Sequence, residues 1–127
     1  MKTRFWIGFF IFSLLFVPAA AQNWVVLGDK TVDRRAENDT IKVKKKGTFR
    51  KIKLQVKGNG VRFFDLKVHF ENGDVLDVAL TAHINRGGQT RVIDLPGGKR
   101  DIKKVVFRYK TQGVRKRKAT VVLLGRR

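Results

Sequence analysis

A stretch of alternating apolar and polar residues between Thr48 and Leu80 sets the strongest limit on how this chain can fold. A period of two places every second side chain on the same face of a β-strand. The residues predicted to face inward are Ile52, Leu54, Val56, Phe64, Leu66, Val68 and Phe70. Each strand would then have one apolar face, which another layer of the protein must cover.

Two short breaks rich in asparagine and glycine divide this stretch. Asn59-Gly60 and Asn72-Gly73 can adopt positive φ at both central turn positions, which suits tight turns between antiparallel strands. The stretch is therefore predicted to form a three-stranded meander. Phe63 is expected to point outward beside Arg62. In a later strand Val92 is expected to be buried, with Ile93 as a second candidate.

The remaining residues continue the same pattern, with about eight or nine short strands and no helical period. A change of parity in the apolar positions predicts a β-bulge near Lys103-Lys104. Residues 119–124 are nearly all apolar and predict a central strand. We therefore expect an all-β fold, a single antiparallel β-sandwich or jelly-roll-like domain.

The first 21 residues have the organisation of a signal peptide. Lys2 and Arg4 precede an apolar run over residues 5–17, and three alanines at 19–21 form a cleavage signal. The run is shorter than the roughly 20 residues that a membrane-spanning helix needs. We expect cleavage after about Ala21, a β-domain over residues 22–127, no transmembrane segment, and a periplasmic or secreted location.

The chain is poor in groups that catalyse reactions. It contains no cysteine, which excludes disulfides and thiolates, and its one serine, Ser13, lies in the predicted signal peptide. His69 and His83, with Asp77, lack the close spacing of metal ligands, so they are expected to be surface residues. We expect a non-enzymatic protein without metal or cofactor.

Positive charge is the clearest functional signal. The sequence holds 29 basic and 10 acidic residues, a net charge of +19, and residues 85–127 contribute 14 of the basic residues and only 2 of the acidic ones. A field of this sign attracts polyanions. The residues predicted to bind anions are Arg115, Lys116, Arg117, Lys118, Lys99, Arg100, Lys103, Lys104, Lys42 and Lys44.

Lysines at outward strand positions permit two interpretations. If residues 40–44 pair with residues 51–56, the outward lysines of adjacent strands form one cationic face, which comprises Lys42, Lys44, Lys51, Lys53 and Lys67. This face could bind phosphate- or carboxylate-bearing polymers. Alternatively, the lysines keep sheet edges from pairing with other chains.

The ordered strand and turn motifs resemble those of a family of short exported bacterial proteins, the YaaI-like proteins, which form a domain of unknown function. The residues that carry the resemblance include Leu27-Gly28, Asp39-Thr40-Ile41, Ile93-Asp94-Leu95 and Ala119-Thr120-Val121. The resemblance implies a periplasmic or secreted β-sandwich and transfers no catalytic residues.

Taken together, the sequence predicts an exported, monomeric, non-enzymatic protein that binds an anionic polymer through basic surface patches. Lipopolysaccharide, an acidic glycan, anionic lipid headgroups and nucleic acid all satisfy this chemistry. The alternative is a structural or adaptor protein of the cell envelope that binds an acidic protein.

Overall fold

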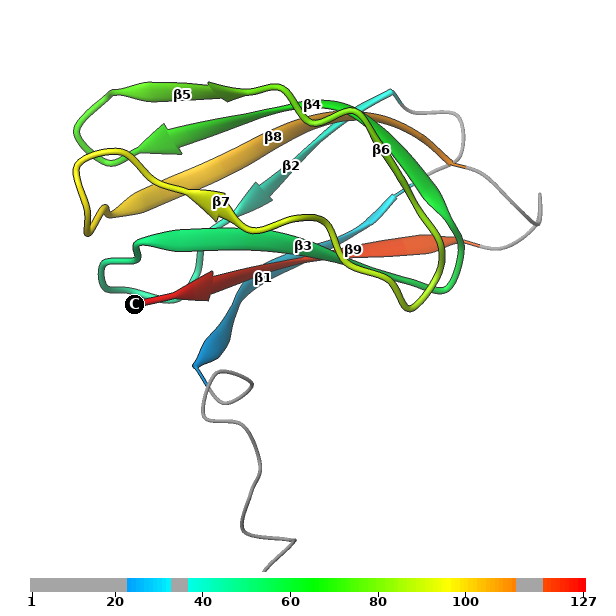
Figure 1. Cartoon of the computed structure of the whole chain (residues 1–127), viewed down its shortest axis with the longest axis horizontal. Coiled ribbons are helices and arrows are strands. Elements are labelled where there is room, and N and C mark those ends of the chain that lie inside the picture. Colours follow the sequence, from blue (N-terminus) through cyan, green and yellow to red (C-terminus); the bar gives the residue numbers. More distant parts are fainter. Residues whose placement is uncertain (1–22, 33–36, 112–117) are drawn as a thin grey trace, which may run out of the picture.

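The computed structural model describes residues 23–32, 37–111 and 118–127, which form nine strands and no helix (Figure 1). The predicted signal peptide lies outside these residues. None of the described residues belongs to a helix of the length and hydropathy that crossing a membrane requires. The strands are β1 (Trp24–Val32), β2 (Asn38–Lys42), β3 (Lys51–Lys57), β4 (Val61–Phe70), β5 (Val75–Val78), β6 (Ala82–Ile84), β7 (Ile93–Asp94), β8 (Ile102–Thr111) and β9 (Ala119–Arg126).

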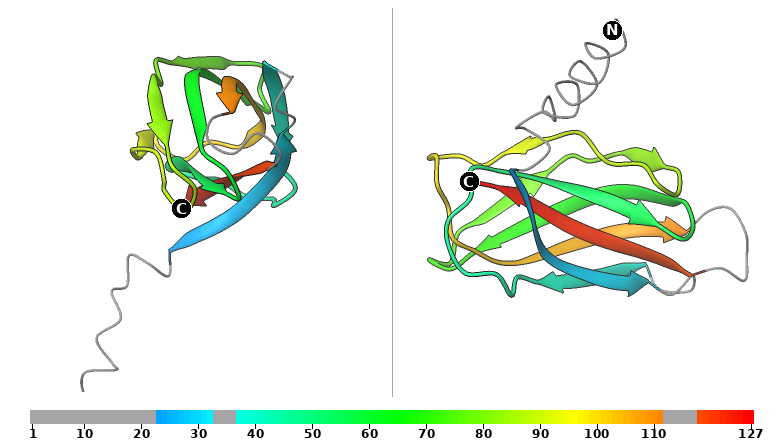
Figure 2. Two further views of the ribbon diagram at one scale, coloured as in Figure 1. Left: turned by 90° about the vertical axis from the view of Figure 1, so that its right-hand side faces the viewer. Right: turned by 90° about the horizontal axis from the view of Figure 1, so that it is seen from below.

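Two antiparallel sheets pack against each other, which confirms the predicted all-β sandwich (Figure 2). The first sheet has the order β1-β9-β3-β7, and the second has the order β2-β8-β4-β5, with β6 paired to the start of β4. Strand β9 lies between β1 and β3, as its apolar sequence predicted. The core between the sheets includes the predicted inward residues Ile52, Leu54, Val56, Leu66, Val68 and Phe70.

The two phenylalanines at the start of β4 exchange the places that the sequence predicted for them. Phe63 is fully buried, with its ring centroid 5.9 Å from that of Phe107, whereas Phe64 is only half-buried. The cause is a shift in the register of β4 against β8 between Phe63 and Asp65, which makes Phe64 the extra residue of a bulge. The prediction of Phe64 in the core and Phe63 outside was therefore wrong.

The second bulge lies where the sequence predicted one. His69 is opposite Lys104 and Phe70 is opposite Ile102, so Lys103 is the unpaired residue of β8. Val92, in contrast, was wrongly predicted to be buried, because it is 42% exposed while its neighbour Ile93 lies in the core.

The predicted three-stranded meander does not form. Strand β3 belongs to the first sheet and pairs with β9 and β7, whereas β4 and β5 form a hairpin in the second sheet. The connection over residues 58–60 therefore passes from one sheet to the other. The hairpin turn was predicted in the right place, but only Gly73 has positive φ there, at 96°, and no described non-glycine residue does.

Candidate functional site

Basic residues from several separate segments gather at one end of the sandwich. The loop between β2 and β3 meets the start of β8 and the end of β9 here. Backbone hydrogen bonds join these segments, from Phe49 N to Arg100 O at 2.8 Å, from Arg50 N to Arg126 O at 2.8 Å and from Val43 N to Lys103 O at 3.1 Å.

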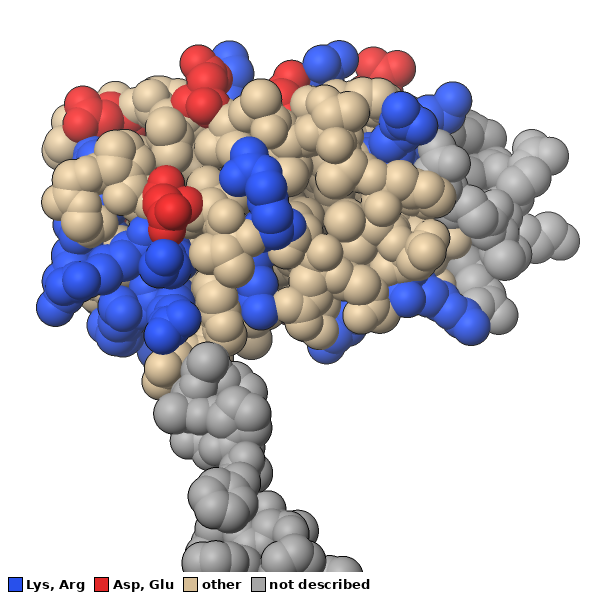
Figure 3. Space-filling model, viewed as in Figure 1, with Lys and Arg blue, Asp and Glu red and all other residues tan. Residues whose placement is uncertain are grey.

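We call this surface the basic end. It comprises Lys42, Lys44, Lys45, Lys46, Arg50, Lys99, Lys103, Lys104, Arg126 and Arg127. Figure 3 shows part of it as the largest group of Lys and Arg atoms in that view, near the start of β3 and the end of β9.

Three cationic or protonatable side chains lie in one row on the outer face of the second sheet. Lys42 on β2 is opposite Lys104 on β8, and Lys104 is opposite His69 on β4. Neighbouring strands are about 4.8 Å apart. No carboxylate occupies these three positions, so an anion above the row would offset the repulsion between the ammonium groups.

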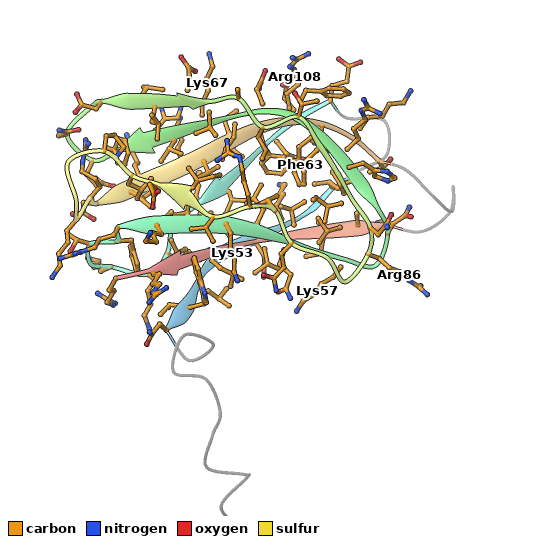
Figure 4. All side chains as sticks on the ribbon, viewed as in Figure 1. Lys53, Lys57, Phe63, Lys67, Arg86 and Arg108 are labelled. Atoms are coloured by element: carbon orange, nitrogen blue, oxygen red, sulfur yellow. The ribbon has the colours of Figure 1, made fainter. Side chains whose placement is uncertain are left out.

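Farther along the same face, carboxylates neutralise the cations. Lys67 Nζ lies 3.8 Å from Asp77 Oδ1, and Arg108 Nη2 lies 3.0 Å from Asp65 Oδ2. In Figure 4 Lys67 and Arg108 both project outward from the second sheet. The contrast between these pairs and the Lys42–Lys104–His69 row locates the uncompensated charge near the basic end.

Lysines of the loop between β2 and β3 line two neighbouring hollows in the surface. Lys44, Lys45 and Lys46 line a hollow of about 350 Å³, to which Glu71 and Asp101 also contribute. Lys44 and Lys45 also line a neighbouring hollow of about 290 Å³ beside β1. All three lysines are exposed and form none of the ion pairs found among described residues.

Two arginines complete the basic end on the first sheet. The Arg127 guanidinium lies 4.8 Å from the centroid of the buried Phe49 ring and packs against Gly47. Arg126 is opposite Trp24 on one side and Lys51 on the other. Guanidinium groups offer paired N–H donors that match the oxygens of phosphate and carboxylate.

Arg100 and Lys51 lie beside the basic end but have partners within the protein. The Arg100 side chain is only 18% exposed, and it donates hydrogen bonds to Asp74 Oδ2 and Pro96 O, both at 3.0 Å. Its guanidinium also lies 3.9 Å from the Phe70 ring centroid. Lys51 Nζ lies 2.8 Å from Asp94 Oδ1. These contacts give Arg100 a structural role.

The acidic residues of the protein cannot neutralise its basic ones. Five ion pairs join described residues and engage Asp39, Asp65, Asp74, Asp77 and Asp94. Even if all 10 acidic residues of the chain were paired, 19 of its 29 basic residues would keep an uncompensated charge. A surface of this kind carries a positive field that draws in anions.

The structure brings together two groups of predicted residues that are distant in sequence. Lys42 and Lys44 meet Lys103 and Lys104 because β2 pairs with β8 and not with β3, the pairing on which the predicted lysine face depended. The predicted lysine face therefore does not exist, since Lys51 and Lys53 lie in the other sheet.

Lys99 is the remaining predicted anion-binding residue that belongs to the basic end, and it is exposed in the connection from β7 to β8. Lys118 precedes β9 and so lies at the opposite end of that strand from Arg126. Arg115, Lys116 and Arg117 lie outside the described residues.

Several members of the basic end were not among the predicted site residues, namely Lys45, Lys46, Arg50, Arg126 and Arg127. The lysine run at 44–46 and the final arginine pair are visible in the sequence. Their proximity is not, because it depends on the end of β9 lying beside the start of β3.

The two histidines and Asp77 lie in different places on the second sheet. His69 pairs with Val75, His83 pairs with Arg62, and Asp77 pairs with Lys67. Within residues 23–32, 37–111 and 118–127, no three potential metal ligands come together.

The comparison with solved structures finds similarity to proteins that include AlgX and YomS. AlgX of Pseudomonas aeruginosa aligns with a TM-score of 0.50 and 9% identity over 81% of this chain, which spans 27% of AlgX. The SPBc2 prophage-derived protein YomS aligns with a TM-score of 0.37 and 14% identity over 80% of this chain and 91% of YomS. At such identities the similarity to AlgX concerns the fold alone.

The comparisons by sequence give a family without an assigned activity. No curated protein matches the chain significantly. Residues 8–125 match the profile of the domain of unknown function DUF2541, and this match spans most of the sequence. The chain therefore belongs to the DUF2541 family.

Proposed function

We propose that this protein binds an anionic polymer at the basic end of its sandwich. The observation that carries the proposal is the concentration of cations that form none of the ion pairs between described residues, above all the exposed Lys44, Lys45 and Lys46 together with the Lys42–Lys104 pair. These side chains come from strands and from a loop that hydrogen bonds hold to the sandwich, so much of their arrangement exists before a ligand arrives. Prior arrangement lowers the entropic cost of binding.

The chemistry of the basic end suits a chain of phosphates, sulfates or carboxylates. Lysines supply compact point charges, while Arg50, Arg126 and Arg127 can engage two oxygens of one group at once. Each anionic group that the protein neutralises releases counterions, so the affinity should fall steeply with salt.

We further propose that the protein is exported, acts without catalysis and works in the periplasm or outside the cell. The support for export is the charged and apolar organisation of residues 1–21. The support for a non-enzymatic role is the scarcity of nucleophiles in residues 22–127, which contain neither serine nor cysteine. The resemblance to the YaaI-like proteins, which implies a periplasmic or secreted protein, agrees with the proposal of export.

The proposal is tested by removing the same charge from the two ends of the sandwich. The first variant replaces Lys44, Lys45 and Lys46 with Ser. The control replaces Lys57, Arg86 and Lys110 with Ser, residues that are exposed at the opposite end, two of which are labelled in Figure 4. Retention on immobilised heparin is measured over a range of salt concentrations.

The first variant is expected to elute at lower salt than the control. Its salt slope should be smaller by about 0.7–0.9 for each anionic group of the ligand that it no longer neutralises. Equal effects of both variants on elution would mean that total charge decides retention, and the basic end would not be a site. A shallow salt dependence of the native protein would instead favour the alternative, an acidic protein partner.

The segment from Arg115 to Lys118 remains a separate prediction. Replacing these four residues with Ser tests it in the same assay. A decrease in retention larger than that of the variant at residues 44–46 would move the principal site to this segment.

A further inference from the structure

We propose that the anionic ligand of the basic end is the surface of a lipid bilayer, which Val26 and Trp24 contact through its headgroup region. This inference rests on the proposed function and narrows it to one class of ligand. It follows from an exposed apolar strand end that lies among the cations.

The first half of β1 carries one exposed apolar side chain, Val26, next to the half-buried Trp24. Val26 pairs with Leu124 and Gly28 pairs with Leu123, so Leu27 is the extra residue of a bulge and turns into the core. Val26 consequently remains on the outer face, where it is 55% exposed, more than any other large apolar residue described. Figures 1 and 2 show this part of β1 running away from the body of the sandwich.

Cations lie on both sides of this strand end. On one side, Lys44 and Lys45 share a surface hollow with Val26, and Asp29 contributes one carboxylate to it. On the other side, Lys53 Nζ lies 4.2 Å from the centroid of the Trp24 ring, and Arg126 is opposite Trp24 on β9. Figure 4 shows Lys53 projecting outward from the first sheet. Apolar and cationic groups therefore share one surface.

This combination fits a membrane surface better than a soluble polymer. Val26 can form no side-chain hydrogen bond with a sugar or a base. The Lys53 ammonium already lies over the Trp24 ring and occupies space that a stacked sugar or base would need. Tryptophan, by contrast, favours the boundary between headgroups and acyl chains, where its ring is buried and its N–H stays near water.

The energetics of membrane binding also require both components. Each lysine or arginine near a bilayer of anionic lipids raises the affinity about fivefold, and a short apolar contact adds to that attraction without inserting irreversibly. A short apolar contact alone binds a bilayer only weakly and reversibly, and here it is combined with the cations of the basic end.

The test measures sedimentation with vesicles of phosphatidylcholine alone and of phosphatidylcholine mixed with phosphatidylglycerol. The protein is used as purified after export, with its N-terminus determined by mass spectrometry. If residues 1–21 have been removed, Trp24 is the only tryptophan, so a blue shift of its fluorescence reports its entry into the interface directly. Binding is expected with the mixed vesicles and to be at least tenfold weaker with the neutral ones.

Val26→Ser keeps every charge and is expected to weaken binding to the mixed vesicles by about three- to tenfold, since it removes the apolar contact. The matched control is Val75→Ser, because Val75 is 48% exposed but lies on β5 in the other sheet. Replacing Lys44, Lys45 and Lys46 with Ser should weaken vesicle binding about fivefold for each lysine.

The outcomes separate this inference from the function on which it rests. The bilayer inference would be overturned if the protein bound heparin tightly but did not bind mixed vesicles. It would also be overturned if Val26→Ser and Val75→Ser bound mixed vesicles equally well. Either result would leave the polyanion function intact. Equal binding to neutral and mixed vesicles would also overturn the bilayer inference. Failure of the native protein to bind either heparin or mixed vesicles would overturn both.

Discussion

Lys42 on β2 lies directly opposite Lys104 on β8, at the edge of the second sheet that leads into the basic end. Like charges at directly opposed positions of antiparallel strands destabilise the pair. The repulsion is not relieved on the other side, since the next position across the sheet is His69. The opposed lysines therefore lower the free energy of unfolding, and a bound anion would reduce the repulsion between them.

Replacing Lys42 with Glu should stabilise the protein and weaken its binding to polyanions. The new carboxylate would face the Lys104 ammonium across the ladder, which is worth about 0.2–1 kcal/mol in the free energy of unfolding. Urea denaturation measures the stability, and heparin elution measures the binding. Lys110→Glu, at the far end of β8, is the control for net charge, and it should retain more heparin affinity than Lys42→Glu. A less stable Lys42→Glu protein would contradict the expectation.

The bulge at the start of β4 gives neighbouring phenylalanines very different energetic roles. Phe63→Ala removes a fully buried ring that contacts Phe107 and should cost about 3–5 kcal/mol of stability. Phe64→Ala removes a half-buried ring whose centroid lies 5.3 Å from the Arg108 guanidinium, and it should cost about 1 kcal/mol or less. Urea denaturation of both variants measures the two decreases in the free energy of unfolding. Similar decreases in stability would mean that both rings support the core equally.

The bulge at Phe64 in β4 and the bulge at Lys103 in β8 show how far the sequence alone predicts the strands. The bulge at Lys103 interrupts an alternation of charged and apolar residues, so it leaves a visible change of parity. The bulge at Phe64 changes the parity too, since Val61 and Phe63 face inward before it and Leu66 after it, but the prediction extended the later alternation back to Phe64. Alternation thus predicted the strands and most of the core, but not which of two adjacent phenylalanines turns inward.

The assignment of strands to sheets, and with it the site, was harder to predict. A short connection over residues 58–60 suits a hairpin as well as a passage between sheets, and local sequence does not distinguish the two. Lysines at 42 and 44 and at 103 and 104 were each recognised, but β2 was assigned the wrong partner. Only the pairing of β2 with β8 and of β9 with β3 brings the basic end together.

Gly28 is expected to be intolerant of a side chain because β1 approaches β2 closely there. A Cβ atom at Gly28 would lie 2.7 Å from Lys42 O and 2.8 Å from Ile41 Cγ2, and the neighbouring Leu27 O accepts a hydrogen bond from Lys44 N at 3.0 Å. Gly28→Ala should therefore cost about 1–3 kcal/mol through overpacking. Thermal and urea denaturation both measure this decrease in stability.

The matched control for Gly28 is Gly60→Ala. The nearest atom to a Cβ at Gly60 is Ile84 O at 3.4 Å, an ordinary contact, and the φ angle of Gly60 is not in the positive region that disfavours alanine. Its stability should change by less than about 1 kcal/mol. Equal effects of the two substitutions would mean that β1 and β2 can move apart at little energetic cost to accommodate the added methyl group.

Arg100 provides the means to separate structural from binding cations. Its side chain joins Asp74, Pro96 O and the Phe70 ring, and thereby ties the turn between β4 and β5 to the connection before β8. Arg100→Lys keeps the charge but cannot form the same set of planar contacts, so it should cost about 1–3 kcal/mol of stability. Heparin elution should stay close to that of the native protein, because the net charge is unchanged and Arg100 is largely buried. The opposite result would be native stability with a marked decrease in heparin retention. It would place Arg100 among the anion-binding residues, with its internal contacts replaced by contacts to the ligand.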